Sequence, residues 1–391
     1  MRALSGLLLL LSSVLSAGEI QFETQELDSA VAKVACYAVS LADVNTDGKP
    51  DVIAVTENRV LWYENPTWKP RVIIEDQVER DHVCIAPFDI DGDGQIDFAL
   101  GAGWTKLGTM YWLKRGASLD EKWQVFPIAK EVSTHRMRFG NVLGKDRPQL
   151  VVSPLNPSEA PGVRLLAFEI PNAPTADRWP LTVMDESLHR VHNHWHLDLN
   201  GDHVDGTLTS SQEGVFLFRH EGSGKFSKRQ IGTGTAGTKP EETGAGEVKL
   251  GRLGKDKFFL ATVEPMHGHS VVVYTGPMPL PEGQLADRQV IDDSFKQGHA
   301  LGCADLDHDG VDEIIAGHRE PNTDGKVAVY YYRASNDAGT KWDRHPLDLG
   351  GMASEDLVTG DLNGDGYPEV IAGGRATHNL KIYWNRTAAS R

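Results

Sequence analysis

A carboxylate-rich segment recurs along the chain at nearly even spacing and constrains the fold more than any other feature of this sequence. Seven copies begin 46 to 57 residues apart, with strand-like apolar runs between them and no helical period. The best four copies read Asp-x-Asp/Asn-x-Asp-Gly and begin at Asp43, Asp89, Asp305 and Asp361. Repeats of this length that contain strands but no helix are typical of propeller blades. We therefore predict an all-β fold, a seven-bladed β-propeller of four-stranded blades.

The spacing inside the loop indicates a binding site for a hard divalent ion. Oxygen side chains at positions 1, 3 and 5 point to one side, glycine at position 6 permits the turn, and an acid at position 9 closes the shell. We expect structural calcium in the four complete loops. The predicted ligands are Asp43, Asn45, Asp47, Asp51, Asp89, Asp91, Asp93, Asp97, Asp305, Asp307, Asp309, Glu313, Asp361, Asn363, Asp365 and Glu369.

The other three copies are degraded. Asp198 opens a fifth copy in which His203 replaces the glycine and Gly206 stands at position 9. Asn141 and Gly251 open two copies that lack the carboxylates. We expect these three loops to bind ions weakly or not at all.

The first residues resemble a targeting segment. Arg2 is followed by an apolar run over 7–15 that is too short to span a membrane, and residues 16–18 are small. We predict a signal peptide over 1–18 and one propeller domain over 19–391, with no membrane span, secreted or periplasmic, and monomeric. The acidic excess, 55 Asp and Glu against 39 Lys and Arg, argues against nucleic acid as a partner.

The last repeat ends after its third strand. The segment from Gln21 to Leu27 resembles an outer strand, so we predict that it completes the last blade and closes the ring. Cys36, Cys84 and Cys303 lie on predicted inner strands, and we interpret them as small buried residues rather than as a disulfide framework.

Histidines gather at one predicted end of the central channel. The residue six positions before each loop begins the inner strand on the face opposite the ion loops, and three of the seven are histidine: His135, His192 and His299. The ends of the second strands reach the same face. Together these positions provide the catalytic candidates His135, His192, Glu264, His267, His299 and Asp356. The substrate-binding candidates are Tyr37, His82, Trp104, Arg136, His318, Arg375 and His378.

Each candidate also has a structural interpretation. Trp104 can stack on a sugar or cover the channel, and Arg136 can hold a substrate carboxylate or pair with an acid of the next blade. His194 and His196 alternate along one strand and are better interpreted as core histidines that bond to a neighbouring blade. His135, His192 and His299 recur in register on different blades, which favours a functional site and is compatible with zinc or another divalent metal.

The ion loops, with their inner-strand and third-strand patterns, resemble the FG-GAP/VCBS class of seven-bladed propellers. The segments 135–139, 188–192, 264–268, 298–300 and 374–379 are similar to a bacterial group related to the propeller of fungal aldos-2-ulose dehydratase. That family removes water from keto-sugars with the help of a bound metal. Its C-terminal domain has no counterpart here, so activity located there is not implied.

The residue types at this end of the channel and the family resemblance indicate the same reaction class. A metal held by histidines polarises a ketone, and a second His or Glu takes the neighbouring proton. We predict an exported carbohydrate lyase or dehydratase that performs metal-assisted β-elimination on a keto-sugar or keto-glycoside. Two alternatives stay open: a non-catalytic propeller that binds a glycan or protein, and a metal-independent polysaccharide lyase with Tyr37 as a candidate acid.

Overall fold

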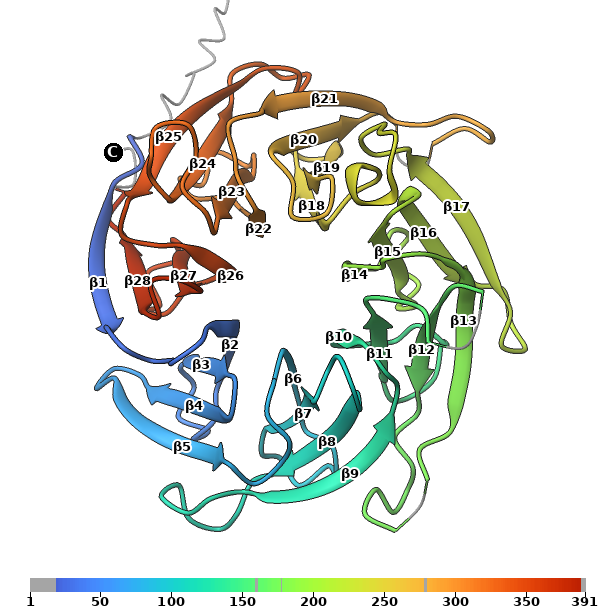
Figure 1. The fold of residues 1–391 in the computed structure, drawn as a ribbon, viewed down its shortest axis with the longest axis vertical. Helices are drawn as coiled ribbons and strands as arrows, with labels where there is room; N and C mark the ends of the chain where they lie inside the picture. The colour runs from blue at the N-terminus through green and yellow to red at the C-terminus, as the bar shows by residue number, and fades with distance from the viewer. Residues whose placement is uncertain (1–18, 159–160, 177, 278–279, 388–391) are drawn as a thin grey trace, which may run out of the picture.

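A computed structural model describes residues 19–158, 161–176, 178–277 and 280–387 of the chain. The predicted signal peptide over 1–18 lies outside these residues. Seven four-stranded antiparallel sheets stand around a central axis like the blades of a propeller (Figure 1), as the repeat predicted. In the described part of the chain no helix is long and apolar enough to cross a membrane.

Each blade runs from an inner strand at the axis to an outer strand at the rim. The inner strands are β2 (Cys36–Ala42), β6 (Cys84–Phe88), β10 (Thr134–Gly140), β14 (Asn193–Leu197), β18 (Glu247–Arg252), β22 (Gly298–Ala304) and β26 (Ser354–Gly360). The second strands are β3 (Asp51–Thr56), β7 (Asp97–Ala102), β11 (Gln149–Pro154), β15 (Gly206–Ser211), β19 (Phe258–Glu264), β23 (Glu313–His318) and β27 (Glu369–Gly374).

The third strands are β4 (Arg59–Glu64), β8 (Thr109–Lys114), β12 (Val163–Phe168), β16 (Gly214–His220), β20 (Ser270–Thr275), β24 (Ala328–Ala334) and β28 (Leu380–Asn385). The outer strands are β5 (Lys69–Glu75), β9 (Gln124–Lys130), β13 (Leu181–Leu188), β17 (Phe226–Gly232), β21 (Asp287–Asp292), β25 (Trp342–Leu349) and β1 (Phe22–Asp28). One short 3-10 helix, η1 (Pro240–Glu242), precedes blade five.

The core lies between neighbouring blades. Every residue of β3, β7, β11 and β15 is buried, because both faces of a second strand are covered by the adjacent sheets. Between blades one and two, Phe98 packs against Trp123 with ring centroids 5.4 Å apart, next to the buried Trp62. Such continuous apolar packing around the ring holds the blades in fixed positions relative to the axis.

The ends of the chain close the ring. β1 pairs antiparallel with β28, with Phe22 opposite Asn385, and forms the outer strand of the last blade. Trp384 Nε1 donates a hydrogen bond of 2.8 Å to Gln25 Oε1 across this pair. The predicted closure is confirmed, and the last blade has no unpaired third strand.

Candidate functional site

The carboxylate loops lie on one face of the ring and are organised locally. In the first loop the Asp43 carboxylate accepts the backbone N–H groups of Asp47 and Gly48, at 3.0 and 2.9 Å. Gly48 has a φ of 86°, a conformation that side-chain-bearing residues rarely adopt, which accounts for the glycine at position 6. The turn therefore forms from short-range bonds alone, with its acidic side chains gathered on one side.

Two loops gather three carboxylates each closely enough to share an ion. The candidate ligand oxygens lie within 4.8 Å of one another in the groups Asp89, Asp91, Asp97 and Asp305, Asp307, Glu313. The position-9 acids are buried, and burial raises the pKa of Asp97 to about 6 and that of Glu313 to about 9. Carboxylates crowded around a buried acid in this way fit a divalent cation, so the residues present suit calcium, which would displace Lys114 from Asp91 and Arg333 from Asp307.

The degraded loops are held differently. In blade three Asn141 N donates to Asp205 of blade four at 2.7 Å, and Asp205 N donates back to Asn141 O at 2.9 Å. Asp312 of blade six forms the same reciprocal pair with Arg252 of blade five, at 3.0 and 2.9 Å. An acid of the next blade thus holds the backbone of each loop that lacks the ion-binding carboxylates.

Bulges direct side chains into the opposite end of the channel. The pairing of the inner strand with the second strand shifts register at Tyr37, His135, His299 and Glu355, so each of these is the extra residue of a bulge. A β-bulge bends the strand and re-aims its side chain. All four residues stand six positions before a loop of the repeat. The bulge therefore recurs at the same position in these blades and turns their side chains toward one another at the axis.

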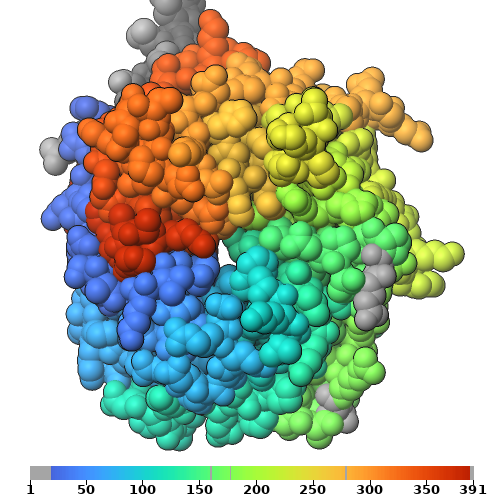
Figure 2. Space-filling model, viewed as in Figure 1, coloured from blue at the N-terminus to red at the C-terminus, as the bar shows by residue number. Residues whose placement is uncertain are grey.

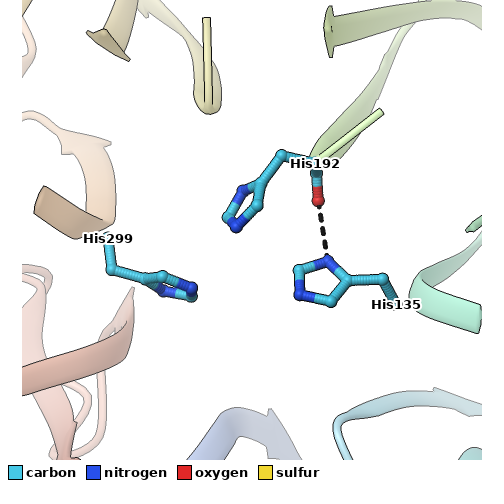
Figure 3. Close-up of side chains that lie close together, drawn as sticks. All are labelled: His135, His192 and His299. Carbon is cyan, nitrogen blue, oxygen red and sulfur yellow. Dashed lines mark hydrogen bonds between the residues drawn. The ribbon is translucent and has the colours of Figure 1, made fainter. Parts of the chain in front are cut away.

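Three histidines meet on the axis. Nitrogen atoms of His135, His192 and His299 lie within 4.8 Å of one another, and Figure 3 shows their rings pointing toward a common space. A fourth ring, that of His267, adjoins them, with its Nε2 atom 2.9 Å from His192 Nε2. We call these four residues the histidine cluster.

Hydrogen bonds orient the three rings. His135 Nδ1 lies 3.0 Å from the carbonyl oxygen of His192, and His192 Nδ1 lies 3.1 Å from that of Gly246. His299 Nδ1 is bonded to the carbonyl oxygen of Glu355. A carbonyl only accepts, so each Nδ1 carries the proton and each Nε2 keeps its lone pair. The lone pairs of His192 and His135 face neighbouring donors, His267 Nε2 at 2.9 Å and Arg136 Nη1 at 3.4 Å. Once these contacts are displaced, three Nε2 atoms beside one another fit a borderline metal such as zinc.

The cluster is electrically neutral and surrounded by paired charges. Burial lowers the pKa of His135, His267 and His299 well below the ordinary value, and neighbouring cationic and imidazole groups lower it further. Burial also lowers the pKa of His192, although Glu247 opposes the shift. Neutral imidazoles are the form that binds metal or accepts a proton.

Two carboxylates flank the cluster. Glu247 Oε1 lies 3.0 Å from His192 Nδ1, and its other oxygen is bonded to Asn193. Glu355 binds the guanidinium groups of Arg319 and Arg375 at 3.1 and 2.8 Å. Glu355 is therefore already paired with two arginines, whereas Glu247 Oε1 has no hydrogen bond of its own among the described residues.

Four of the predicted substrate-binding residues lie around the cluster. The Trp104 ring centroid is 5.6 Å from that of His135, and Arg136 Nη1 donates to the His135 carbonyl at 3.1 Å. Arg375 stacks over the Tyr37 ring at 5.5 Å from its centroid. These contacts place apolar and cationic side chains around the mouth of the site.

Other predicted site residues point elsewhere. Both carboxylate oxygens of Glu264 are engaged at the rim of blade five, by Tyr274 at 2.6 Å and Arg288 at 2.7 Å. Asp356 accepts the backbone N–H of Val39 at 3.0 Å and lines the channel below the histidine cluster. The placement of Glu264 beside the histidines is thus wrong, because the end of β19 turns its side chain outward.

The three remaining histidine candidates also make other contacts. His318 bonds to the carbonyl oxygen of Glu320 at 2.8 Å and packs on Phe295. His82 is fully buried, and burial lowers its pKa to about 4. His378 is half-buried in a turn with a φ of 55°. Among the described residues, none of the three hydrogen-bonds to a cluster histidine.

The alternating histidines of β14 pack in the core, as predicted, but only His194 makes the predicted hydrogen bond to the neighbouring blade. His194 Nδ1 bonds to Ser153 Oγ of the neighbouring blade at 2.9 Å, whereas His196 Nδ1 bonds to Thr207 within its own blade at 3.1 Å. Glu247 and Glu355 are not among the site residues predicted from the sequence. An acid on an otherwise buried inner strand, as at Glu247, is a usable signal, and Glu355 stands six residues before its loop, as the three histidines do.

Comparison with known proteins agrees with this architecture. A model of FG-GAP-like repeats matches residues 43–100 and 305–372, and a model of the β-propeller domain of aldos-2-ulose dehydratase matches residues 107–277. The chain is a seven-bladed β-propeller that contains FG-GAP-like repeats and is similar to the propeller of aldos-2-ulose dehydratase. The dehydratase match spans His135, His192 and His267 of the histidine cluster.

The curated relative of this propeller is much longer than the chain. The aldos-2-ulose dehydratase of Phanerodontia chrysosporium is 26% identical over 295 residues, which are 69% of this chain and 32% of that protein. The chain thus spans about a third of the length of this relative.

Solved structures resemble the propeller in fold alone. The crystal structure of BBS1N in complex with ARL6DN superposes with a TM-score of 0.57 at 14% identity, covering 97% of this chain and 100% of that one. The extracellular domain of a putative one-component system from B. thetaiotaomicron has a TM-score of 0.53 at 11% identity, covering 93% and 39%.

Proposed function

We propose that this propeller is a carbohydrate lyase of the dehydratase type, which performs β-elimination on a keto-sugar or keto-glycoside at the histidine cluster. The observation that carries the proposal is the convergence of three Nε2 lone pairs, each set by an Nδ1 hydrogen bond to a carbonyl oxygen. The similarity to aldos-2-ulose dehydratase supports the same reaction class and a sugar ligand.

Different histidines of the cluster have different roles in this proposal. His135, His192 and His299 would hold a divalent metal, which supplies the Lewis acidity that polarises a ketone. His267, half-buried at the edge of the cluster with a low pKa, is the neutral base that removes the proton next to the ketone carbon. As that C–H bond breaks, the carbon–carbon double bond forms and the β-hydroxyl leaves.

The leaving group needs a proton. Burial raises the pKa of Tyr37, so its hydroxyl stays protonated at neutral pH and can donate to the departing oxygen. Arg375 lies over the Tyr37 ring and is itself fixed by Glu355. Water is then the second product of the dehydration. Glu264 has no part in this scheme, because its carboxylate is bound by Arg288 and Tyr274.

The decisive experiment combines metal analysis with turnover. Purified protein would be offered 1,5-anhydrofructose or a 3-keto-glycoside, with the enone product followed by absorbance and mass spectrometry. We expect His135→Ala, His192→Ala and His299→Ala each to lose the bound transition metal and about 10²-fold or more of the turnover, the scale of losing a metal or a general acid–base group. His269→Ala is the matched control, since His269 is exposed two residues from His267.

One observation favours a second candidate function, a propeller that binds a glycan without catalysis. Glu355 is already paired with two arginines, and a hydrogen bond between His192 and His267 would satisfy two of the rings. If the wild-type protein retains no transition metal and converts no keto-sugar, while calorimetry detects glycan binding that His135→Ala abolishes, the binding function replaces the lyase.

The proposal includes calcium in the four complete loops and export of a monomer to the periplasm or the medium. Its basis is the set of ion-loop carboxylates and the signal-like segment over 1–18. N-terminal sequencing of the exported protein would test cleavage after residue 18. Light scattering would test the monomer.

A further inference from the structure

The central channel contains a chamber beside the histidine cluster. A cavity of about 510 Å³ is lined by residues of all seven inner strands. On each strand the lining begins at or after the residue that stands six positions before the loop, and it ends no more than five residues beyond that residue. It therefore extends along the axis from the histidine cluster toward the ion loops, and Figure 2 shows the molecule hollowed at the centre of the ring. Its volume is in the range of sites for small molecules.

The wall of this chamber is unusually cationic for an acidic protein. Arg136, Arg138 and Lys249 line it, and Asp356 is the one acid among the lining residues. Glu247 lies next to them, 3.7 Å from Arg136 and 3.9 Å from Lys249. Three cations facing two carboxylates leave a net charge of +1, in a chain whose net charge is −16.

Lys249 is the least satisfied of these groups. It is 9% exposed, and its Nζ lies over the Trp195 ring at 4.6 Å from the centroid. Its ammonium forms no hydrogen bond to any residue in the described part of the chain, since the contact with Glu247 is 3.9 Å long. An ammonium has three donors, and leaving them unpaired in a buried site is costly.

Arg138 adds donors beside the same indole. Its guanidinium carbon lies 4.9 Å from the Trp195 centroid. Both of its hydrogen bonds come from Nη1, to Asn193 Oδ1 at 2.8 Å and the His194 carbonyl at 2.7 Å. Within the described residues Nε and Nη2 bond to no protein group, which leaves one edge of the guanidinium for a bidentate acceptor.

We propose that this chamber binds an oxyanion of monosaccharide size, such as the carboxylate of a sugar acid, through Lys249 and Arg138. The bound oxyanion accepts hydrogen bonds from Lys249 Nζ and Arg138 Nη2, and its charge balances the excess of one cation. Trp195 holds both cations by cation–π contacts and so keeps their donors aligned. This site does not depend on the lyase proposal, because none of its binding groups belongs to the histidine cluster.

Calorimetry with D-glucuronate, D-glucose and inorganic sulfate tests the site. We expect glucuronate to bind and glucose, which lacks the charge, to bind at least about tenfold more weakly. Binding of sulfate as well would support the same oxyanion chemistry without the sugar. Equal binding of glucuronate and glucose, or no binding of either anion, would overturn the proposal.

Variants locate the site. Lys249→Met should weaken glucuronate binding about tenfold or more, whereas Lys249→Arg should retain most of it. Lys255→Met is the matched control, since Lys255 is exposed and lies outside the chamber. A Lys249→Met protein that folds and binds like the parent contradicts the assignment.

A labelling experiment on the unaltered protein covers the case in which Lys249→Met fails to fold. Trace acetylation followed by peptide mass spectrometry measures the reactivity of each lysine, and glucuronate should protect Lys249 but not Lys255. Unchanged labelling of Lys249 at a saturating glucuronate concentration would refute the proposal.

Discussion

The two ends of the channel carry candidate metal sites of opposite construction. On one face each carboxylate loop collects its ligands from within nine residues, and the turn is held by bonds such as Asp43 to Gly48. On the other face the ligands come from blades three, four and six, and they meet only because the ring is closed. The first kind of site is a property of a segment, and the second is a property of the whole fold.

The chemical setting differs in the same way. Burial raises the pKa of the position-9 acids of the loops and lowers the pKa of the cluster histidines, because it disfavours the charged form of each. A cation therefore relieves charge repulsion in the loops, whereas the histidine cluster is stable as a neutral group. Ion loss should accordingly affect stability at one end and chemistry at the other.

Removing the strand that closes the ring should have the largest effect and should separate the two kinds of site. A chain without residues 19–28 leaves β28 with an open edge and frees the last blade to move away from the axis. We expect loss of cooperative unfolding, protease sensitivity and loss of any metal held by the histidine cluster. Limited proteolysis and metal analysis measure both effects. A truncated protein that melts like the parent would show that β1 is dispensable.

Calcium removal should have the next largest effect. Each complete loop saturated at about 100 times its Kd stabilises the fold by about 2.7 kcal/mol. Excess chelator should therefore lower the melting temperature markedly, and added calcium should restore it. Asp361→Ala, which removes the first ligand of one loop, should lower it less than the chelator does. An unchanged midpoint in chelator would contradict the calcium assignment.

The loops without carboxylates should respond differently from the ion loops. Asp205 and Asp312 hold the loops of blades three and five, which lack carboxylates for an ion. Asp312→Ala removes a charge-assisted bond to Arg252 N and should destabilise the protein by about 1–3 kcal/mol. The loss should be the same with calcium and with chelator, as measured by urea unfolding. A loss that calcium abolishes would indicate an ion site in blade five instead.

Mild acid, at about pH 6, should act through buried histidines with the smallest effect. Burial lowers the pKa of His196 to about 3, below the ordinary value of 6.5. The unfolded chain therefore binds this proton first, and stability is lost as the pH falls from 6.5 toward 3, by at most about 1.4 kcal/mol per pH unit. His196→Asn should flatten this slope without changing stability at pH 8. Parallel slopes for parent and variant would contradict the assignment.

Much of the architecture was predictable because its determinants are local. The loop period fixes the number of blades, the residue at position 6 must tolerate a positive φ, and the strand-like segment over 21–27 has only one unfilled place in the ring. The two acids that hold the degraded loops can also be recognised in the sequence. Asp205 and Asp312 stand at position 8 only in the blades that follow a degraded loop.

The candidate site was predictable in part. A count of six residues back from each loop selects His135, His192 and His299, because equivalent positions of a closed ring face the axis. The same count does not reveal that Glu264 turns outward to Arg288 while Glu247 turns inward to His192. Such choices depend on which partner lies within reach, and the partners here are 24 and 55 residues away along the chain.

The sequence by itself thus determined the ring, its closure and the turn of the carboxylate loops, since these follow from short-range spacing and turn chemistry. Only the tertiary structure decided which imidazole nitrogens are free, which carboxylates are already paired, and that Lys249 lies in a chamber without a hydrogen-bonding partner among the described residues. The physical reason is that protonation state and pairing depend on burial and on neighbours from other blades. Those neighbours are brought together only when the seven sheets close around the axis.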